Sequence, residues 1–374
     1  MAPKKILAIK LRSMGDTVLM IAPILEMTRS FPQAEIDIAV LDIWAPLFEG
    51  MPGIHRIWTI PHSLGRYSRL MELTRLALRL RKEKYDCVVN FHASPSTAKL
   101  SFATGAPCRS IHFHGHYDRD HFSTVEIPGK GTLKPVIERD MDTVRALGIH
   151  VPAGLTPQVY LRPSEEAEAQ TLLDRFGIPK PILALNLGAS RPTKSWPIER
   201  YGSLAIEWCR KEKGGVLAIA GPSEEPLIRT FLNSIDDLLL ANFSDTHTRA
   251  QIRSRITATH GLSLRILAAV MSKVSVVAGN DSGPKHLAVA VNTPTVTLFG
   301  PEHPFEWHPY PKERHPYLFT ESLPCRKDAD PGMPAWCGIF ECETEEHKCM
   351  RLIGVDSVFN ECKRVAKRPT NQIT

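Results

Sequence analysis

Apolar residues in the first half of the chain alternate between short continuous runs and helical spacing. Residues 4–11 form a short apolar run, and residues 15–29 repeat apolar side chains every three or four positions. The same alternation predicts strands at 35–41, 54–60 and 85–91 and a helix at 65–84. Short apolar strands separated by amphipathic helices are typical of a parallel sheet that is covered on both faces.

The alternation restarts after a stretch rich in Pro and Gly at residues 151–163. In the second half it predicts helices at 164–176, 197–213, 262–272 and 282–291, and strands at 181–187, 216–220, 274–278 and 294–299. The sequence therefore predicts two doubly wound α/β halves that are joined near residue 160.

The composition is that of a soluble globular enzyme. The 374 residues are 43% hydrophobic and 23% charged, with a formal net charge of +6. The Lys and Arg residues form no dense block, so we expect no nucleic-acid partner and favour an acidic small substrate or a lipid. The first ten residues lack a signal-peptide core, and no apolar run approaches the length of a membrane span. We expect a cytoplasmic protein with reduced thiols and at most peripheral membrane contact.

The first candidate for chemistry is Ser13-Met14-Gly15-Asp16, which follows the first strand and opens a helix. Gly15 permits close approach of the backbone, and Asp16 lies where a carboxylate can take a proton from an attacking hydroxyl. An acid at the start of a helix is also favoured by the helix dipole, so capping is the alternative role of Asp16.

The second candidate is the loop at residues 186–197, Asn-Leu-Gly-Ala-Ser-Arg-Pro-Thr-Lys-Ser-Trp-Pro. Ser190, Arg191 and Lys194 give it a hydroxyl and two cations, and Pro197 is placed as the first residue of a helix. Such a loop can hold a diphosphate and offset the charge of a departing leaving group. The alternative is an ordinary solvated loop.

A third candidate is the segment at residues 279–286, Gly-Asn-Asp-Ser-Gly-Pro-Lys-His, between a strand and a helix. The amides near Ser282 and Gly283 stand at the amino end of that helix, which is an anion-binding position. Asp281 can instead cap the helix, and His286 can be a packed helix residue.

A fourth candidate is the acid in Ala220-Gly-Pro-Ser-Glu224, again directly after a strand. Glu224 can accept hydrogen bonds from a ribose or sugar hydroxyl, or simply lie exposed. All four segments fall at the carboxyl ends of strands, where the loops of an open α/β sheet form its binding crevice.

In their order along the chain, these motifs resemble glycosyltransferase family 9, the ADP-heptose:lipopolysaccharide heptosyltransferases. They read Ser-x-Gly-Asp, Gly-Ala-Ser-x-x-x-Lys-x-Trp-Pro, Gly-Pro-x-Glu, and Gly-Asn-Asp-Ser-Gly-Pro-x-His-Leu-Ala followed by Leu-Phe-Gly-Pro. The resemblance implies an α/β fold of the GT-B type, with two facing Rossmann-like domains, parallel sheets and a deep interdomain cleft. Residues 1–160 would bind the acceptor, residues 161–354 the nucleotide sugar, and the C-terminal helix within 355–374 would pack back on the first domain.

The resemblance also implies a role for each motif. Asp16 is expected to be the general base of an inverting, metal-independent displacement in which Lys194 also takes part. The implied donor contacts are Ser190, Arg191, Lys194, Glu224, Asp281, Ser282, Gly283 and His286. Lys285 stands where the family often has an apolar residue, so it either adds a phosphate contact or lies exposed.

The acceptor contacts are expected in the first half. A loop rich in His and Arg, with His112, His114, His116 and His121 near Arg109 and Arg119, favours a positively charged surface for phosphates or acidic sugars. A metal held by alternating imidazoles is the less favoured alternative. Together with the basic segment at residues 65–69, this predicts acceptor contacts at Gly15, Arg66, Arg109 and His114.

Five of the eight cysteines follow residue 324. The first four of them lack the paired spacing of a zinc ribbon, so we expect isolated thiols or a disulfide, with a structural metal as the less favoured alternative; they are Cys325, Cys337, Cys342 and Cys349. We expect no cofactor to be required for catalysis.

The sequence thus predicts transfer of a heptose from an ADP-heptose-like donor to an anionic lipopolysaccharide or lipid A-core acceptor, at the cytosolic face of the inner membrane. The alternatives are a transferase that uses another nucleotide sugar, a sugar-nucleotide epimerase of the same architecture, and a non-catalytic sugar-nucleotide-binding protein. No Gly-x-Gly-x-x-Gly follows the first strand and no P-loop motif occurs, which disfavours NAD-linked oxidoreductases and P-loop NTPases.

Overall fold

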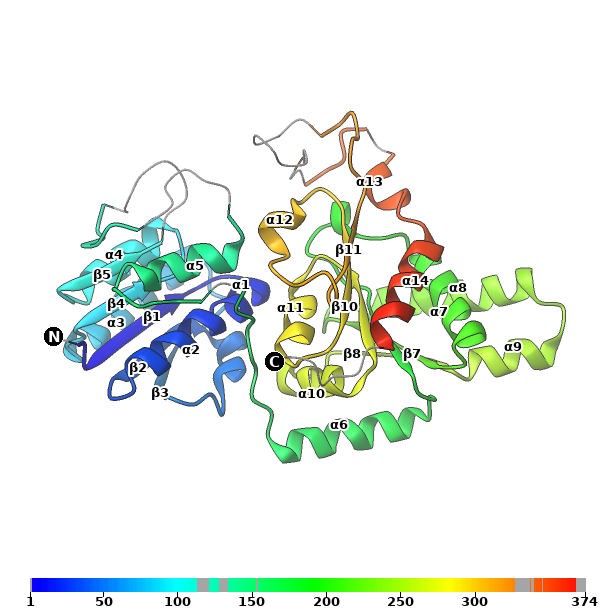
Figure 1. The fold of residues 1–374 in the computed structure, drawn as a ribbon, viewed down its shortest axis with the longest axis horizontal. Coiled ribbons are helices and arrows are strands. Elements are labelled where there is room, and N and C mark those ends of the chain that lie inside the picture. Colours follow the sequence, from blue (N-terminus) through cyan, green and yellow to red (C-terminus); the bar gives the residue numbers. More distant parts are fainter. Residues whose placement is uncertain are drawn as a thin grey trace. The chain divides into compact units, whose positions relative to one another are not determined.

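Two parallel sheets organise the chain, one in each half (Figure 1). The structure is a computed structural model that describes residues 2–112, 121–127, 134–152, 154–326, 337, 340–344 and 346–367. By its internal contacts the chain divides into unit 1, Met1–Tyr160, and unit 2, Leu161–Thr374. Within the described residues, no helix combines the length and the apolar character needed to cross a membrane.

Unit 1 contains a five-stranded parallel sheet in the order β3-β2-β1-β4-β5. Helices α1, α2 and α5 pack with one another, and α3 packs with α4 against the other face. Because both faces are covered, Ile6 through Ile9 of the central strand are all buried, which explains the continuous apolar run. The strands are β1 Lys5–Lys10, β2 Glu35–Leu41, β3 Ile54–Ile60, β4 Cys87–Asn90 and β5 Cys108–Ile111; the helices are α1 Met14–Leu19, α2 Ile21–Ser30, η1 Asp42–Phe48, α3 Arg66–Lys82, α4 Pro95–Ala103 and α5 Val136–Arg145.

The single helix predicted at residues 15–29 is in fact two helices. α1 ends at Leu19, and α2 begins at Ile21. The cause is Pro23, which has no N–H to donate to the carbonyl of Leu19 and whose ring would clash with it. The break lets α1 end soon after Asp16, at the carboxyl edge of the sheet.

Unit 2 contains a six-stranded parallel sheet in the order β11-β10-β9-β6-β7-β8. Helices α7, α8 and α14 pack on one face, and α6, α10 and α11 lie together on the other. The strands are β6 Ile182–Asn186, β7 Gly215–Ala220, β8 Ile256–His260, β9 Val276–Asn280, β10 Thr295–Phe299 and β11 Tyr317–Phe319; the helices are α6 Pro163–Phe176, η2 Pro192–Lys194, α7 Ile198–Lys211, α8 Glu225–Asn242, α9 Thr246–Arg253, α10 Leu264–Lys273, α11 Gly283–Ala290, α12 Pro304–Trp307, α13 Lys348–Arg351 and α14 Val355–Ala366.

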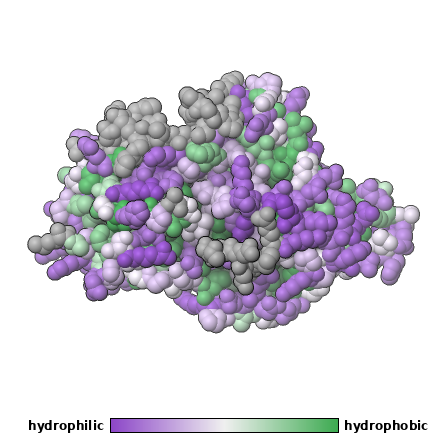
Figure 2. Space-filling model, in the orientation of Figure 1, coloured by the Kyte–Doolittle hydropathy of each residue, from purple (hydrophilic) through white to green (hydrophobic). Residues whose placement is uncertain are grey.

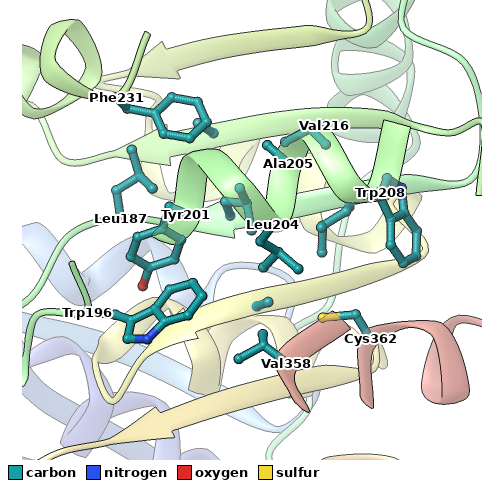
Figure 3. Close-up of a cluster of buried hydrophobic side chains, with 14 of the residues drawn as sticks. Leu187, Trp196, Tyr201, Leu204, Ala205, Trp208, Val216, Phe231, Val358 and Cys362 are labelled. Carbon is teal, nitrogen blue, oxygen red and sulfur yellow. The ribbon is translucent and has the colours of Figure 1, made fainter. Parts of the chain in front are cut away.

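The last helix, α14, packs on the core of unit 2. Its apolar stripe is buried in the core of unit 2, where Val358 and Cys362 lie beside Leu204 and Trp208 of α7 (Figure 3). The ring of Phe359 meets that of Trp208 edge-on, with centroids 6.2 Å apart. This face of α14 is therefore used within unit 2, and a contact of the helix with the first domain stays a prediction.

A buried ion pair ties the central strand of unit 1 to a covering helix. Lys10 at the end of β1 and Asp140 of α5 form it, and both side chains are almost fully buried. Burial raises the pKa of Asp140 to about 6, although the charge of Lys10 opposes this shift; the charge of Asp16 adds to it. Each charge of the pair therefore compensates the other, since both side chains are shielded from water.

We predict that Lys10→Met lowers the free energy of unfolding by about 3–5 kcal/mol, because it leaves Asp140 buried without its counter-ion. Adding Asp140→Asn should restore part of the loss, since the remaining amide is neutral. Urea denaturation measures both. Lys4→Met, a change at an exposed lysine of the same segment, is the matched control and should shift stability by less than about 0.5 kcal/mol. A double variant as unstable as the sum of its two single changes would show that the pair is not coupled.

Candidate active site

The order of strands in unit 2 reverses between β6 and β9. β6 pairs with β7 on one side and with β9 on the other, so the loops that follow β6 and β9 leave the carboxyl edge next to each other. Ligands of open α/β sheets bind at such a point. Gly279 in β9 lies so close to Asn186 in β6 that a Cβ would be 2.4 Å from the Asn186 carbonyl oxygen. Only glycine lets the two strands bring these loops together.

Two asparagines fix the loop that follows β6. The Asn280 side chain accepts a hydrogen bond from the Trp196 amide at 2.9 Å and donates one to the Leu187 carbonyl at 3.0 Å, so it holds both ends of the loop. Asn186 donates to the hydroxyl of Ser282 at 2.8 Å, which links this loop to the start of α11. We had not assigned either asparagine a role from the sequence.

A buried carboxylate joins the two loops. Asp281 is 4% exposed; its Oδ2 accepts a hydrogen bond from Lys194 at 2.8 Å, and its Oδ1 accepts one from Lys285. Lys285 also donates to the Trp307 carbonyl at 2.8 Å and lies 4.4 Å from the centroid of the Phe299 ring. The expectation that Lys285 lies exposed is therefore wrong, while a phosphate contact stays a prediction. Its stem runs through the interior, and its ammonium is the counter-ion of Asp281.

A second carboxylate holds the cations of the loop after β6. Glu302, in the loop after β10, forms an ion pair with Arg191, and its Oε1 is 3.6 Å from Lys194 Nζ. Gly300 permits this approach, because a Cβ there would lie 2.8 Å from the Thr193 carbonyl oxygen. We missed Glu302 in the sequence. Its signal is an acid directly after the strand that neighbours β9, at the same carboxyl edge.

The cluster carries a surplus of positive charge. Burial alone would raise the pKa of Asp281, but the charges of Lys285 and Lys194 hold it well below its usual range. Burial lowers the pKa of Lys285 to about 8, against the opposing charge of Asp281. Burial likewise lowers the pKa of Arg191, although Asp281 opposes this shift. At neutral pH three cations face two carboxylates, Asp281 and Glu302, which leaves a formal charge of 3 − 2 = +1.

The amino end of α11 adds to this surplus. The helix begins at Gly283 with Ser282 as its N-cap residue, so the amide of Gly283 belongs to the first turn, where amides have no acceptor within the helix. The helix dipole places partial positive charge at this end. Ser190 lies exposed at the rim of the same loop cluster. The long side chains of Arg191 and Lys194, one hydroxyl and the start of a helix can together hold a diphosphate.

His286 is buried within the same helix. Its Nδ1 is 2.5 Å from the hydroxyl oxygen of Tyr310. Burial lowers the pKa of His286 well below its usual value, and the charge of Lys285 lowers it further. The ring is therefore neutral and packed, so it contributes no positive charge to an anion at this edge.

Glu224 lies against the start of the loop after β6. Its Oε2 accepts a hydrogen bond from the Gly221 amide at 2.6 Å. A Cβ on Gly188 would lie 2.4 Å from the same oxygen, so glycine at this position makes room for the carboxylate. Glu224 is half-buried and precedes α8, where it stands beside the loop that carries Arg191 and Lys194.

In unit 1 the strand order reverses between β1 and β4, and Asp16 lies beyond this edge in the first turn of α1. Its Oδ2 accepts a hydrogen bond from the Ser13 hydroxyl at 2.6 Å and is 3.7 Å from Nε of Arg12. The N-cap residue of α1 is Ser13. Asp16 is thus held by a hydroxyl and a guanidinium at the carboxyl edge, rather than serving as the cap.

The predicted acceptor residues lie in different surroundings. Gly15 is buried in α1, and Arg66 is exposed at the first position of α3. Arg109 donates to the carbonyl oxygens of Phe122 at 2.8 Å and Ala106 at 2.5 Å, so its guanidinium braces the loop after β5. His114 lies outside the described residues.

The C-terminal cysteines line one pocket of unit 2 together with Thr193, Pro301, Arg326 and His347; they are Cys325, Cys337, Cys342 and Cys349. His347 bonds the Thr193 carbonyl at 2.5 Å, and the amide of Cys337 donates to the Pro301 carbonyl at 3.1 Å. This segment therefore supports the loops after β6 and β10. Among the described residues, all eight cysteines are free, and no three His, Cys, Asp or Glu side chains form a metal-ligand set.

Residues 73–334, about 70% of the chain by this range, match the sequence model of glycosyltransferase family 9 (heptosyltransferase). The chain belongs to glycosyltransferase family 9. This glycosyltransferase is 24% identical over 305 residues to lipopolysaccharide heptosyltransferase 3 of Escherichia coli, which covers 80% of this chain and 84% of the relative. It is 26% identical over 307 residues to lipopolysaccharide heptosyltransferase 2 of Escherichia coli K12, with 80% and 84% covered.

Solved structures agree on the fold. The glycosyltransferase superposes on a family 9 glycosyltransferase from Veillonella parvula with a TM-score of 0.75 at 19% identity, covering 97% of both chains. It superposes on E. coli ADP-heptose lps heptosyltransferase II with a TM-score of 0.71 at 20% identity, covering 97% and 98%. The GT-B type of fold that the sequence predicted is confirmed.

We predict that Gly188→Ala displaces Glu224 and lowers the free energy of unfolding by about 1.5–3 kcal/mol, because the carboxylate must give up its bond to the Gly221 amide. Thermal denaturation measures the loss. In a Glu224→Ala background the same glycine change should cost little, since the obstructing carboxylate is gone. The control is Gly65→Ala, where a Cβ meets nothing within 4 Å. An equal loss with and without Glu224 would contradict this account.

Proposed function

We propose that this glycosyltransferase moves a heptose from an ADP-heptose-like donor to a lipopolysaccharide-type acceptor, with inversion at the sugar carbon. The family and the named relatives support heptosyl transfer. The observation that carries the donor assignment is the cluster of Arg191 and Lys194 around Asp281, at the reversal of strand order in unit 2 and at the start of α11.

In the proposed donor complex, Arg191 and Lys194 leave Glu302 and bind the diphosphate. The two cations lie on one loop and share Glu302, so an incoming dianion can replace that carboxylate. Ser190, Ser282 and the Gly283 amide complete the phosphate contacts. Asp281 holds sugar hydroxyls, and Glu224 accepts a bond from the ribose. His286 supports α11 from within.

The proposed reaction is a single displacement. An acceptor hydroxyl attacks the anomeric carbon of the donor sugar, Asp16 takes the hydroxyl proton, and the bond from the anomeric carbon to the diphosphate oxygen breaks. The nucleoside diphosphate leaves with the electron pair, and Arg191 and Lys194 offset the charge that develops on it. These cations and the helix start supply positive charge at the leaving group, so we propose that no cofactor is required.

The acceptor is assigned to unit 1, where Asp16 lies. We propose that Gly15, which has no side chain, lets an acceptor sugar approach the protein backbone closely. The exposed Arg66 binds an acidic group of the acceptor core. Arg109 acts through the loop that it braces. The acceptor is anionic and lipid-linked, so the reaction takes place at the cytosolic face of the inner membrane.

The direct test is mass spectrometry of the products formed from a panel of nucleotide sugars and truncated lipopolysaccharide acceptors. We expect ADP-heptose to give an acceptor that is heavier by one heptosyl residue, and NMR of the product to show the inverted anomeric configuration. Incubation with donor alone separates the alternatives, because an epimerase would alter the nucleotide sugar without an acceptor. Transfer from a different donor alone would reject the heptose assignment.

We predict that Asp16→Asn lowers kcat in this assay by about 10²- to 10⁴-fold, since an amide cannot take the hydroxyl proton. The dissociation constant of ADP, measured by calorimetry, should not change, because the proposed ADP contacts all belong to unit 2. The control is Asp237→Asn, a change at an exposed aspartate of α8, which should leave kcat unchanged. Full turnover by Asp16→Asn would show that another group is the base.

We predict that ADP binds about tenfold more weakly as the pH rises through about 8, because Lys285 loses its proton and the formal charge of the cluster falls from +1 to zero. The terminal phosphate of ADP loses its last proton near pH 6, so the charge of the diphosphate stays constant through this range. His286 and His308 are already neutral, since burial keeps the pKa of both below its usual value.

Calorimetric titration across this pH range measures the effect. Lys285→Met should bind ADP weakly and without this pH dependence. Lys194 is then the counter-ion of Asp281 that remains, so it cannot move to the diphosphate. A wild-type affinity that stays constant through pH about 8 would contradict the assignment of Lys285.

A further inference from the structure

Helix α3, Arg66–Lys82, has two separate apolar faces. The inner face packs on the sheet of unit 1, where Leu76 and Leu80 are buried and Leu73 and Ala77 are partly buried against the same cluster. A covering helix needs only this one face. The remaining surface of α3 should therefore be polar.

The outer face instead carries four large, exposed apolar side chains. Tyr67 is 81% exposed, Leu70 63%, Met71 47% and Leu78 60%. With 3.6 residues per turn, these positions fall on one stripe of the helix. They are four of the nine large apolar side chains that are exposed among the described residues. No other described helix carries more than one of the nine. Scattered exposed apolar residues are ordinary, but four on one side of a single helix mark a contact surface.

Positive charge is concentrated on the same helix. α3 contains six Arg and Lys residues and one acid, a formal charge of 6 − 1 = +5, whereas the whole chain carries +6. Arg75, Arg79 and Lys82 are exposed and follow one another along one flank of the apolar stripe. Only Arg75 has a partner within the helix, Glu72 at 3.2 Å. Figure 2 shows hydrophobic and strongly hydrophilic side chains side by side on the surface of unit 1.

We propose that the outer face of α3 docks on an anionic phospholipid bilayer. The stripe of Tyr67, Leu70, Met71 and Leu78 enters the interface between headgroups and acyl chains, and the flanking cations bind lipid phosphates while their stems lie along the apolar surface. Charge complementarity selects this occupant. A second copy placed symmetrically would set +5 against +5, which repels, whereas an anionic lipid surface attracts this charge.

The inference rests on the proposed function and assigns the membrane contact of the enzyme to α3. Arg66, the proposed acceptor contact, is the first residue of α3. Docking of this helix therefore holds the acceptor-binding end of unit 1 at the lipid surface, where a lipid-linked acceptor presents its core sugars. A membrane-bound enzyme then meets its lipid-linked acceptor by diffusion along the membrane surface instead of through the surrounding solution.

The test is flotation of the full chain with vesicles made of equal amounts of phosphatidylcholine and phosphatidylglycerol, and with vesicles of phosphatidylcholine alone. We expect binding to the first kind only, weakening as salt is raised. Arg75→Gln/Arg79→Gln/Lys82→Gln should lower the affinity about a hundredfold, at about fivefold for each charge removed. Leu70→Ser/Leu78→Ser should lower it at least about tenfold. Both variants change exposed side chains, so melting temperatures should stay close to that of the wild type.

Matched controls lie on α8 of unit 2. Leu240→Ser, at a leucine that is 64% exposed, and Arg229→Gln, at an arginine whose side chain is 70% exposed, should bind vesicles as the wild type does. Equal binding to both kinds of vesicle, no binding to either, or full binding by the α3 variants would overturn the inference. So would a dimer in analytical ultracentrifugation that Leu70→Ser/Leu78→Ser dissociates.

The two proposals fail separately. A wild-type chain that binds no vesicles but still transfers heptose to a short, water-soluble acceptor would overturn the docking surface alone. Vesicle binding through α3 without transfer from ADP-heptose would overturn the proposed function alone. The α3 variants should act on the soluble acceptor as the wild type does and should lose activity only on acceptor embedded in anionic vesicles.

Discussion

The proposed anion site of unit 2 depends on one buried carboxylate held between two ammonium groups. Asp281 receives Lys194 from the loop after β6 and Lys285 from α11, so a single side chain links the two segments that meet where the strand order reverses. A carboxylate removed from water in this way is stable only when its charge is compensated and its oxygens are bonded. The geometry of both loops therefore follows from keeping Asp281 ionised.

The two lysines do not have equivalent roles. Lys285 is fixed by the Trp307 carbonyl and the Phe299 ring, whereas Lys194 divides its charge between Asp281 and Glu302 and retains some exposure. An incoming diphosphate can thus draw Lys194 outward without leaving Asp281 uncompensated, because Lys285 stays. Glu302 meanwhile keeps the cations of this loop in place before any ligand arrives. Cations positioned in advance need little reorganisation when charge develops on a leaving group, which is the condition for strong electrostatic stabilisation.

The sequence predicted the two parallel sheets well, because a strand buried on both faces leaves a continuous apolar run and a covering helix leaves a 3.6-residue repeat. It also placed Lys194 and Asp281 at carboxyl ends of strands, and the structure joins them by a hydrogen bond. It did not reveal Glu302 or Asn280, since each acts through partners about 85 to 110 positions away along the chain, and pairing over such separations has no local pattern. The break between α1 and α2 does have a local signal, because Pro23 stands four residues after Leu19.

Helix α14 shows the same limit from another side. Its apolar stripe predicts that one face is buried but does not say against what, and the resemblance to the family suggested the first domain. Its apolar stripe packs on α7, and polar contacts from elsewhere in unit 2 accompany this packing: Lys363 pairs with Glu212 at 2.9 Å, and the Ile353 carbonyl just before the helix accepts hydrogen bonds from Trp196 and Arg200. Trp196 closes the loop that carries Lys194, and its amide is held by Asn280. The end of the chain is thereby tied to the loop that presents the cations, so the packing of α14 and the shape of the anion site are parts of one arrangement.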